Sequence, residues 1–273
     1  MYYLNGGGGV LCGFSFGGSP LELNMYNTTI LNNSANIGAG LGALSGNIHM
    51  NRTIIAGNSG DYGSAISMGE PLGLIISDIN MNIINSTIAN NMGLMTVGLI
   101  NSAYLNILNS IFWDNDGEYE FASMPNNDQV NVAGFYSIFE TEFSGEGNLT
   151  NSPLFIDSEN YNFHLTENSP CIDSGINFFN FDDGSSYCIE EYYGYAPDMG
   201  AYEFIPNSEN CDFSSGDVNI DGVLDILDIL QVVNVIMGFI NFTEQQICIA
   251  DINEDYILDI FDIIIMINII LST

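Results

Sequence analysis

The chain has 273 residues, 34 acidic side chains, one basic side chain (Arg52) and a formal net charge of −33. This charge would repel phosphate backbones and anionic lipid, so we expect neither nucleic-acid binding nor docking on a membrane surface. Because 47% of the residues are hydrophobic and 12% aromatic, we expect a folded chain with room for two domains, not a disordered acidic one.

A short β-branched run repeats through the N-terminal half. Its copies are Asn27–Ile30, Asn51–Ile54, Asn85–Ile88, Asn109–Phe112 and, fainter, Tyr136–Phe139. The first two copies and the next two are each 24 residues apart, and the intervening spacing of 34 indicates a ten-residue insertion around residues 70–79. A period in the twenties with Gly and Asn corners is typical of a solenoid whose coils stack on one another.

These repeats predict a mainly β chain, with a right-handed parallel β-helix over residues 1–150. The Leu-x-x-Leu-x-Leu pattern of the competing leucine-rich solenoid is absent. Strands stacked about 4.8 Å apart would form one interior column, consisting of Ile30, Ile54, Ile88 and Phe112. Asparagines at matching positions could form a side-chain ladder; they are Asn33, Asn91 and Asn115.

The start of the chain suggests a fragment. Gly6–Leu11 resembles the Gly-rich part of a coil whose first strand is missing, and no signal peptide is visible. We therefore expect further coils and a lost leader upstream. The most apolar stretch, Tyr256–Leu271, contains polar residues and is too short to span a bilayer, so we expect no membrane span.

The pattern changes after residue 150. Phrases such as Asn168–Gly175 and Pro197–Glu203 resemble the closing segment of secreted bacterial β-helix proteins, which are grouped with pectate-lyase-like folds and choice-of-anchor domains. This resemblance implies a closing segment over residues 151–206 and a secreted protein. It implies no activity, because the architecture hosts lyases, hydrolases, adhesins and inert stalks.

A second repeat occupies the C-terminal end. Gly216–Gly222 is echoed by Ala250–Tyr256 at an offset of 34 residues, and the offset holds through the apolar segments that follow. These segments predict helices at Ile226–Ile236 and Ile260–Leu271, so we expect a small all-α domain over residues 209–273.

Each copy has oxygen-bearing residues at the positions of an EF-hand-like calcium loop. The first loop offers Asp217, Asn219, Asp221, the Val223 carbonyl, Asp225 and Asp228. The second offers Asp251, Asn253, Asp255, the Ile257 carbonyl, Asp259 and Asp262. Two calcium sites are therefore expected; the competing interpretation is a pair of acidic turns that cap helices without metal.

The two loops, each closed by Asp and followed by one helix, resemble type I dockerins. The resemblance implies a cohesin-like partner, and loop positions 10 and 11 assign its recognition to Ile226, Leu227, Ile260 and Phe261. These apolar residues could instead pack inside the module or on the β-helix. Tyr256 replaces the turn glycine of the first loop, so the second site is predicted to bind calcium more weakly.

The five cysteines form no Cys-x-x-Cys pair, which leaves zinc and thioredoxin chemistry without support. Proximity in sequence and the C-terminal repeat suggest the disulfides Cys171–Cys188 and Cys211–Cys248, with Cys12 left over. Such disulfides would fit an oxidising compartment.

No catalytic residue can be assigned. Arg52 lies at a repeat position and is expected to be a surface strand residue, as are His49 and His164. Two groups of acids in loop-like stretches could form a hydrolase pair but read as solvated loops: Asp114, Asp116, Glu118 and Glu120, and Asp182, Asp183, Glu190 and Glu191.

Two functions remain open from the sequence. In the first, the β-helix binds or cleaves polysaccharide, as a glycoside hydrolase or lyase if it is an enzyme, and the dockerin-like module attaches it to a scaffold or cell surface. In the second, the solenoid is a non-catalytic adhesin or stalk whose calcium module serves for anchoring or stability.

Overall fold

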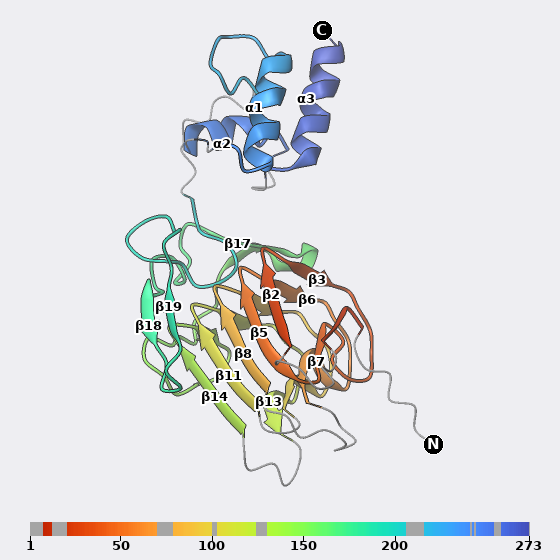
Figure 1. Cartoon of the computed structure of the whole chain (residues 1–273), viewed down its shortest axis with the longest axis vertical. Helices are drawn as coiled ribbons and strands as arrows, with labels where there is room; N and C mark the ends of the chain where they lie inside the picture. Colours follow the sequence, from red (N-terminus) through yellow and green to blue (C-terminus); the bar gives the residue numbers. More distant parts are fainter. Residues whose placement is uncertain are drawn as a thin grey trace. The chain divides into compact units, whose positions relative to one another are not determined.

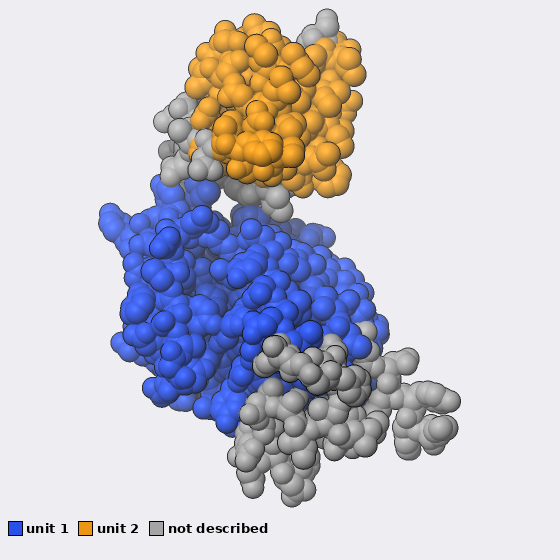
Figure 2. All heavy atoms as spheres, in the orientation of Figure 1, with its two compact units in different colours: residues 1–205 blue, residues 206–273 orange. Residues whose placement is uncertain are grey.

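The computed structural model describes residues 8–12, 21–69, 79–99, 103–123, 130–205, 216–240, 242, 244–253 and 258–272. The chain divides into two compact units, residues 1–205 and residues 206–273 (Figure 2). The insertion predicted around residues 70–79 falls almost entirely outside the described residues.

Three parallel five-stranded sheets build the first unit (Figure 1). The first sheet contains β1 (Val10–Cys12), β4 (Leu41–Ala43), β7 (Tyr62–Met68), β10 (Met95–Leu99) and β13 (Tyr119–Ser123). The second contains β2 (Glu22–Tyr26), β5 (Gly46–Asn51), β8 (Ile79–Ile84), β11 (Ala103–Leu108) and β14 (Val130–Phe135). The third contains β3 (Thr29–Leu31), β6 (Ile54–Ala56), β9 (Thr87–Ala89), β12 (Ile111–Trp113) and β15 (Ile138–Phe139). Each coil contributes one strand to each sheet, so the predicted fold class, a mainly β solenoid followed by a small helical region, is confirmed.

The interior column of the third sheet differs from the prediction by one residue in the second coil. Ile30 pairs with Ile55, and Ile55 pairs with Ile88, so the predicted Ile54 was wrong. Ile54 faces the opposite side, where it packs against Phe163 and Ala201. The second coil is one residue longer than the motif alignment assumed, and a slip of one residue moves a strand side chain to the other face.

The predicted asparagine ladder is present and has one more rung. Asn58 Nδ2 donates to Asn91 Oδ1 at 3.0 Å, and Asn91 Nδ2 donates to Asn115 Oδ1 at 3.0 Å. Asn33 continues the ladder through Asn58 Oδ1 at 3.0 Å. Asn58 was missed because of the same slip. The ladder satisfies buried backbone groups at the corner that follows the third sheet.

The closing segment contains β16 (Phe155–Asp157), the 3₁₀ turn Ser158–Asn160, β17 (Asn162–Leu165), β18 (Phe178–Asn180) and β19 (Ser186–Cys188). Part of it covers the outer face of the third sheet, where Phe163 and Leu165 pack against residues such as Ile54 and Ile111. Farther on, Phe181 packs against the outer face of the second sheet. The outer face of the third sheet is therefore largely covered, whereas that of the second sheet is covered only in part, where Ile84 and Leu108 lie.

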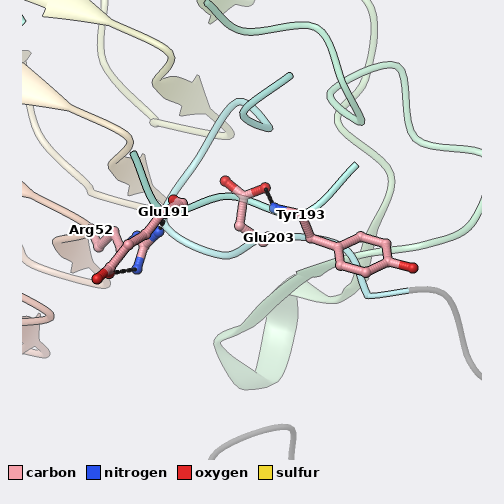
Figure 3. A network of polar contacts seen from close by, with 4 residues as sticks. All are labelled: Arg52, Glu191, Tyr193 and Glu203. Atoms are coloured by element: carbon pink, nitrogen blue, oxygen red, sulfur yellow. Dashed lines mark hydrogen bonds and ion pairs between the residues drawn. The ribbon is translucent and has the colours of Figure 1, made fainter. Parts of the chain in front are cut away.

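Arg52 ties the coils to the closing segment, as Figure 3 shows. It lies in the turn between β5 and β6, and its guanidinium is 3.7 Å from the Glu191 carboxylate and also donates to the Glu191 carbonyl oxygen. Its φ of +51° matches the left-handed backbone of Asn27 and Asn85 at the same corner. Arg52 is thus a turn residue with a structural contact, not the strand residue that we expected.

The predicted Cys171–Cys188 disulfide is wrong, because both cysteines are free. Cys171 is buried in the core that joins the closing segment to the third sheet, whereas Cys188 is exposed at the end of β19. Proximity in sequence did not bring the two residues together. Cys12 is also free, as predicted.

The second unit contains α1 (Ile226–Ile236), α2 (Glu244–Ala250) and α3 (Ile260–Ser272). Its core combines Val218 with Ile229, Val232, Ile249 and Met266 from the three helices. We did not predict α2. Cys248 on this helix is disulfide-bonded, and its predicted partner Cys211 lies outside the described residues. Among the described helices, none is both long and apolar enough to cross a bilayer.

Candidate calcium and partner-binding site

The first acidic loop folds around its own side chains. Asp217 accepts hydrogen bonds from the backbone N–H groups of Asp221 at 3.1 Å and Gly222 at 2.7 Å. Asn219 Oδ1 accepts from the Asp221 N–H at 2.8 Å, and Asp221 accepts from the Val223 N–H at 3.0 Å. The turn needs glycine at position 222, whose φ is +90°.

Two aspartates join this loop to α1. Asp225 is the N-cap, and its side chain accepts from the Leu227 N–H at 2.7 Å. Asp228 is fully buried and accepts from the Asn219 N–H at 3.2 Å and from the Asp225 N–H at 2.9 Å. This reciprocal capping satisfies the free N–H groups of the first helical turn and holds the loop against the helix.

The second loop repeats this arrangement where it is described. Asp259 accepts from the Phe261 N–H at 2.7 Å. Buried Asp262 accepts from the N–H groups of Ile252 at 3.0 Å and Asp259 at 2.9 Å. The predicted ligands Asp255 and Ile257, together with Tyr256, lie outside the described residues.

The chemistry of the first loop fits a hard cation. In the described parts of the chain no three carboxylate, thiol or imidazole groups converge on one point, since the loop carboxylates turn to backbone N–H groups. Nevertheless the side chains of residues 217–228 offer only oxygen donors and carry four aspartates, and residues 206–273 contain no lysine, arginine or histidine. A buried carboxylate such as Asp228 without a cation is costly, and calcium would offset this charge.

The predicted partner-binding residues are exposed. Ile226 and Leu227 on α1 are 61% and 53% exposed, and Ile260 and Phe261 on α3 are 61% and 60% exposed. None of them joins the core of its own unit. Leu230 and Ile264, one helical turn farther on, extend the same two faces. This pair was not predicted, although the four-residue spacing places each above the first residue of its helix.

Three carboxyl groups of the first unit have strongly raised pKa values. Burial raises the pKa of Glu120 to about 8, with a further contribution from Glu140. Burial also raises the pKa of Asp198 to about 6 and, together with the Asp198 charge, that of Glu203 to about 7. Asp198 accepts from the N–H groups of Asp173 and Phe204, so it organises the closing segment. The motif Pro197–Glu203 was the sequence signal for this structural pair.

Among the other predicted loop acids, two line the same depression and two are held by other residues. Asp116 and Glu118 line a shallow open depression of about 460 Å³ together with Asp61. Asp183 accepts from Asn106, whereas Glu191 holds Arg52.

Fold and loops together define a modular protein, in which a parallel β-helix is followed by a helical unit with paired acidic loops. Residues 215–271 match the family model of the dockerin type I domain, so the chain carries a type I dockerin at its C-terminal end. Dockerins bind calcium and cohesin partners and occur in extracellular proteins. No significant match was found among curated proteins or among solved structures.

Proposed function

We propose that this chain is a secreted protein whose dockerin attaches a polysaccharide-directed β-helix to a cohesin-bearing scaffold or cell surface. The dockerin match over residues 215–271 carries the proposal. The β-helix would then be the cargo that the dockerin places on the assembly.

Calcium would be held by the two loops. In the first, the ligands would be Asp217, Asn219, Asp221, the Val223 carbonyl, Asp225 and Asp228. In the second they would be Asp251, Asn253, Asp255, the Ile257 carbonyl, Asp259 and Asp262. Support comes from the matching contacts of Asp228 and Asp262 in the two copies. Tyr256 at the turn position would make the second site weaker.

The cohesin would contact the apolar ends of α1 and α3. Ile226, Leu227, Ile260 and Phe261 are large, exposed and excluded from the unit's core, which supports an interface there. Large apolar residues at an interface centre provide most of its binding energy when water is excluded around them.

The polysaccharide part of the proposal rests on the general association of dockerins with glycan-degrading systems. A catalytic β-helix would be a glycoside hydrolase or lyase, and no residue is assigned to that chemistry. A non-catalytic adhesin or stalk is the second candidate. It is favoured by the asparagine ladder, which runs uninterrupted through four successive coils from Asn33 to Asn115.

A calcium-replete assay of the whole chain on a polysaccharide panel tests this part. It records both retention on insoluble glycan and release of new sugar ends. Retention is the expected result, and new ends would add catalysis. The absence of both signals would contradict a polysaccharide role and leave the stalk.

A further inference from the structure

The outer face of the second sheet carries two rows of polar side chains. Strand register places Glu22, Asn47, Asn80, Tyr104 and Asn131 in one row. It places Asn24, His49, Asn82, Asn106 and Ala133 in the next. A solvent-facing strand position needs only a polar side chain of any kind. On β2, β5, β8 and β11, however, five of the eight positions in these rows are asparagine and only Glu22 is charged, which indicates a preference for amide groups.

The β18–β19 hairpin lies along this face and contacts the second row (Figure 1). Asp183 in its turn accepts a hydrogen bond from Asn106 Nδ2 at 2.7 Å. The Tyr187 hydroxyl lies 3.3 Å from His49 Nδ1. Asn82 and Asn106 are buried although their side chains point outward from the helix. The hairpin therefore forms a wall beside the part of the face that stays open.

A chain of hydrogen bonds fixes the orientation of these polar groups. A carboxylate such as Asp183 can only accept from an amide, so Asn106 directs its Nδ2 outward, and the same Nδ2 donates to Asn82 Oδ1 at 3.0 Å. Asn82 Nδ2 then faces His49 Nδ1 at 3.2 Å. In neutral His49 the proton consequently lies on Nε2, for which no partner occurs among the described residues.

Next to this ordered edge the face is open and aromatic. Tyr104, which is 40% exposed, lies in the first row beside exposed Asn80, whereas Tyr26, which is 62% exposed, lies beyond exposed Asn24 in a third row with Asn51. Asn80 donates to Asn47 Oδ1 at 2.9 Å, which keeps this row in a fixed arrangement. Exposed tyrosines beside fixed amides offer a stacking surface together with donors and acceptors.

We propose that this outer face, formed by β2, β5, β8 and β11 and bounded by the β18–β19 hairpin, binds a neutral, hydroxyl-rich glycan chain. The inference rests on the polysaccharide role proposed above and gives that role a location. Amides pair with sugar hydroxyls, and the rings of Tyr26 and Tyr104 stack on the apolar faces of sugar rings.

Charge and spacing select the ligand class. The chain has a net charge of −33, and its one basic side chain is already paired with Glu191, so a polyuronate is repelled. Successive rungs are separated by about 4.8 Å, which is comparable to the length of one sugar residue in an extended polysaccharide. Each rung can therefore meet one sugar of a chain that lies across the strands.

Retention of the whole chain and its variants on insoluble xylan and cellulose, with soluble polygalacturonate as the charged probe, tests this site. Tyr104→Ala and Tyr26→Ala remove exposed rings without opening the core, and each is expected to weaken retention about tenfold. Tyr119→Ala on β13 and Tyr195→Ala in the closing segment remove exposed tyrosines elsewhere and should leave retention unchanged. Circular dichroism confirms folding of each variant.

The outcomes separate this inference from the proposed function. Retention of the wild-type chain that survives Tyr104→Ala and Tyr26→Ala overturns the site and leaves the polysaccharide role intact. No retention of the wild-type chain on any glycan overturns both. Tighter binding to polygalacturonate overturns the neutral-ligand assignment, and a dimer that dissociates in Tyr104→Ala overturns the glycan in favour of a second copy of the chain.

Discussion

Asp228 on α1 and Asp262 on α3 are buried carboxylates that make the same contacts 34 residues apart in the chain. Each accepts a hydrogen bond at 2.9 Å from the N–H of the aspartate just before its helix, Asp225 or Asp259. Each also accepts one from the N–H of the loop asparagine, at 3.2 Å for Asn219 and 3.4 Å for Asn253. Each therefore links the start of its loop to the start of its helix. The duplication is thus a repeat of structure as well as of sequence.

Replacing Asp228 by Asn should impair the first loop. The amide loses the charge that favours calcium and directs one N–H group toward a backbone donor, which should cost about 1.5 to 3 kcal/mol in the free energy of unfolding of the second unit in calcium. Calcium affinity of one site should fall at least about tenfold by isothermal titration calorimetry. Asp61→Asn, an exposed change in the first unit, is the control; equal effects of both variants would contradict the role of Asp228.

The two loops should differ in calcium affinity, because the turn position is Gly222 in the first and Tyr256 in the second. Gly222 has a φ of +90°, and a side chain there costs on the order of 1 kcal/mol. Gly222→Ala should weaken the first site about fivefold, and Tyr256→Gly should strengthen the second by a similar factor. Calcium titration of the wild-type chain should resolve two unequal sites. Two equally tight sites would disprove this explanation.

The asparagine ladder should contribute strongly to the stability of the β-helix. Asn91 is fully buried, donates to the Ile55 carbonyl at 2.9 Å and accepts from Asn58 at 3.0 Å. Asn91→Ala removes the acceptor of the buried Asn58 backbone N–H and the side-chain donor to the Ile55 carbonyl, so urea unfolding should show a loss of about 2 to 4 kcal/mol. Asn131→Ala, on an exposed strand position, should change the free energy of unfolding by less than about 0.5 kcal/mol.

Thiol titration distinguishes free Cys171 and Cys188 from the disulfide that the sequence predicted between them. In the native chain only exposed Cys188 should react rapidly, because burial raises the pKa of Cys171 to about 12 and also raises that of Cys12. In denaturant without reductant, three thiols should be counted, those of Cys12, Cys171 and Cys188. A count of one thiol would restore the Cys171–Cys188 disulfide.

Asp198 and Glu203 should make the first unit less stable as the pH rises. Their folded-state pKa values, about 6 and about 7, lie above those of unfolded carboxyl groups, so the folded chain holds more protons in between. The free energy of unfolding should therefore be highest below the unfolded pKa and fall through pH 6 to 7. Fluorescence of Trp113, the single tryptophan, follows this unit in urea.

Glu203→Gln is the matched variant for this pH effect. It should flatten the decline in stability between about pH 5 and pH 8, whereas Glu159→Gln, which removes an exposed acid of the same segment, should not. Parallel declines in all three proteins would contradict the assignment to the Asp198–Glu203 pair.

The repeats revealed the architecture because repetition is a strong signal in sequence. Strand spacing in the first repeat predicted parallel coils, and the 34-residue offset predicted α1 within its observed bounds, Ile226–Ile236. The dockerin match, over residues 215–271, covers both of these repeated loops. In each case several positions recur together, so one irregular residue such as Tyr256 did not obscure the pattern.

Features that occur once were harder to predict. Helix α2 appears in neither repeat copy, and its only sequence signal is Thr243 followed by Glu244. The additional residue in the second coil displaced Ile54 from the interior column because strand faces alternate at every residue. The separation of Cys171 from Cys188 depends on how the closing segment divides between two sheets, and no local pattern encodes that choice.

Surface plasmon resonance of the whole chain on immobilised type I cohesins, in calcium and then in chelator, tests attachment through the dockerin. We predict binding to at least one cohesin in calcium and its loss in chelator. Ile226→Asp combined with Ile260→Asp should weaken binding at least about a hundredfold, whereas Ile156→Asp, on an exposed strand of the first unit, should not. Binding that persists in chelator, or that is unchanged in the Ile226→Asp, Ile260→Asp double variant, would contradict attachment through the dockerin.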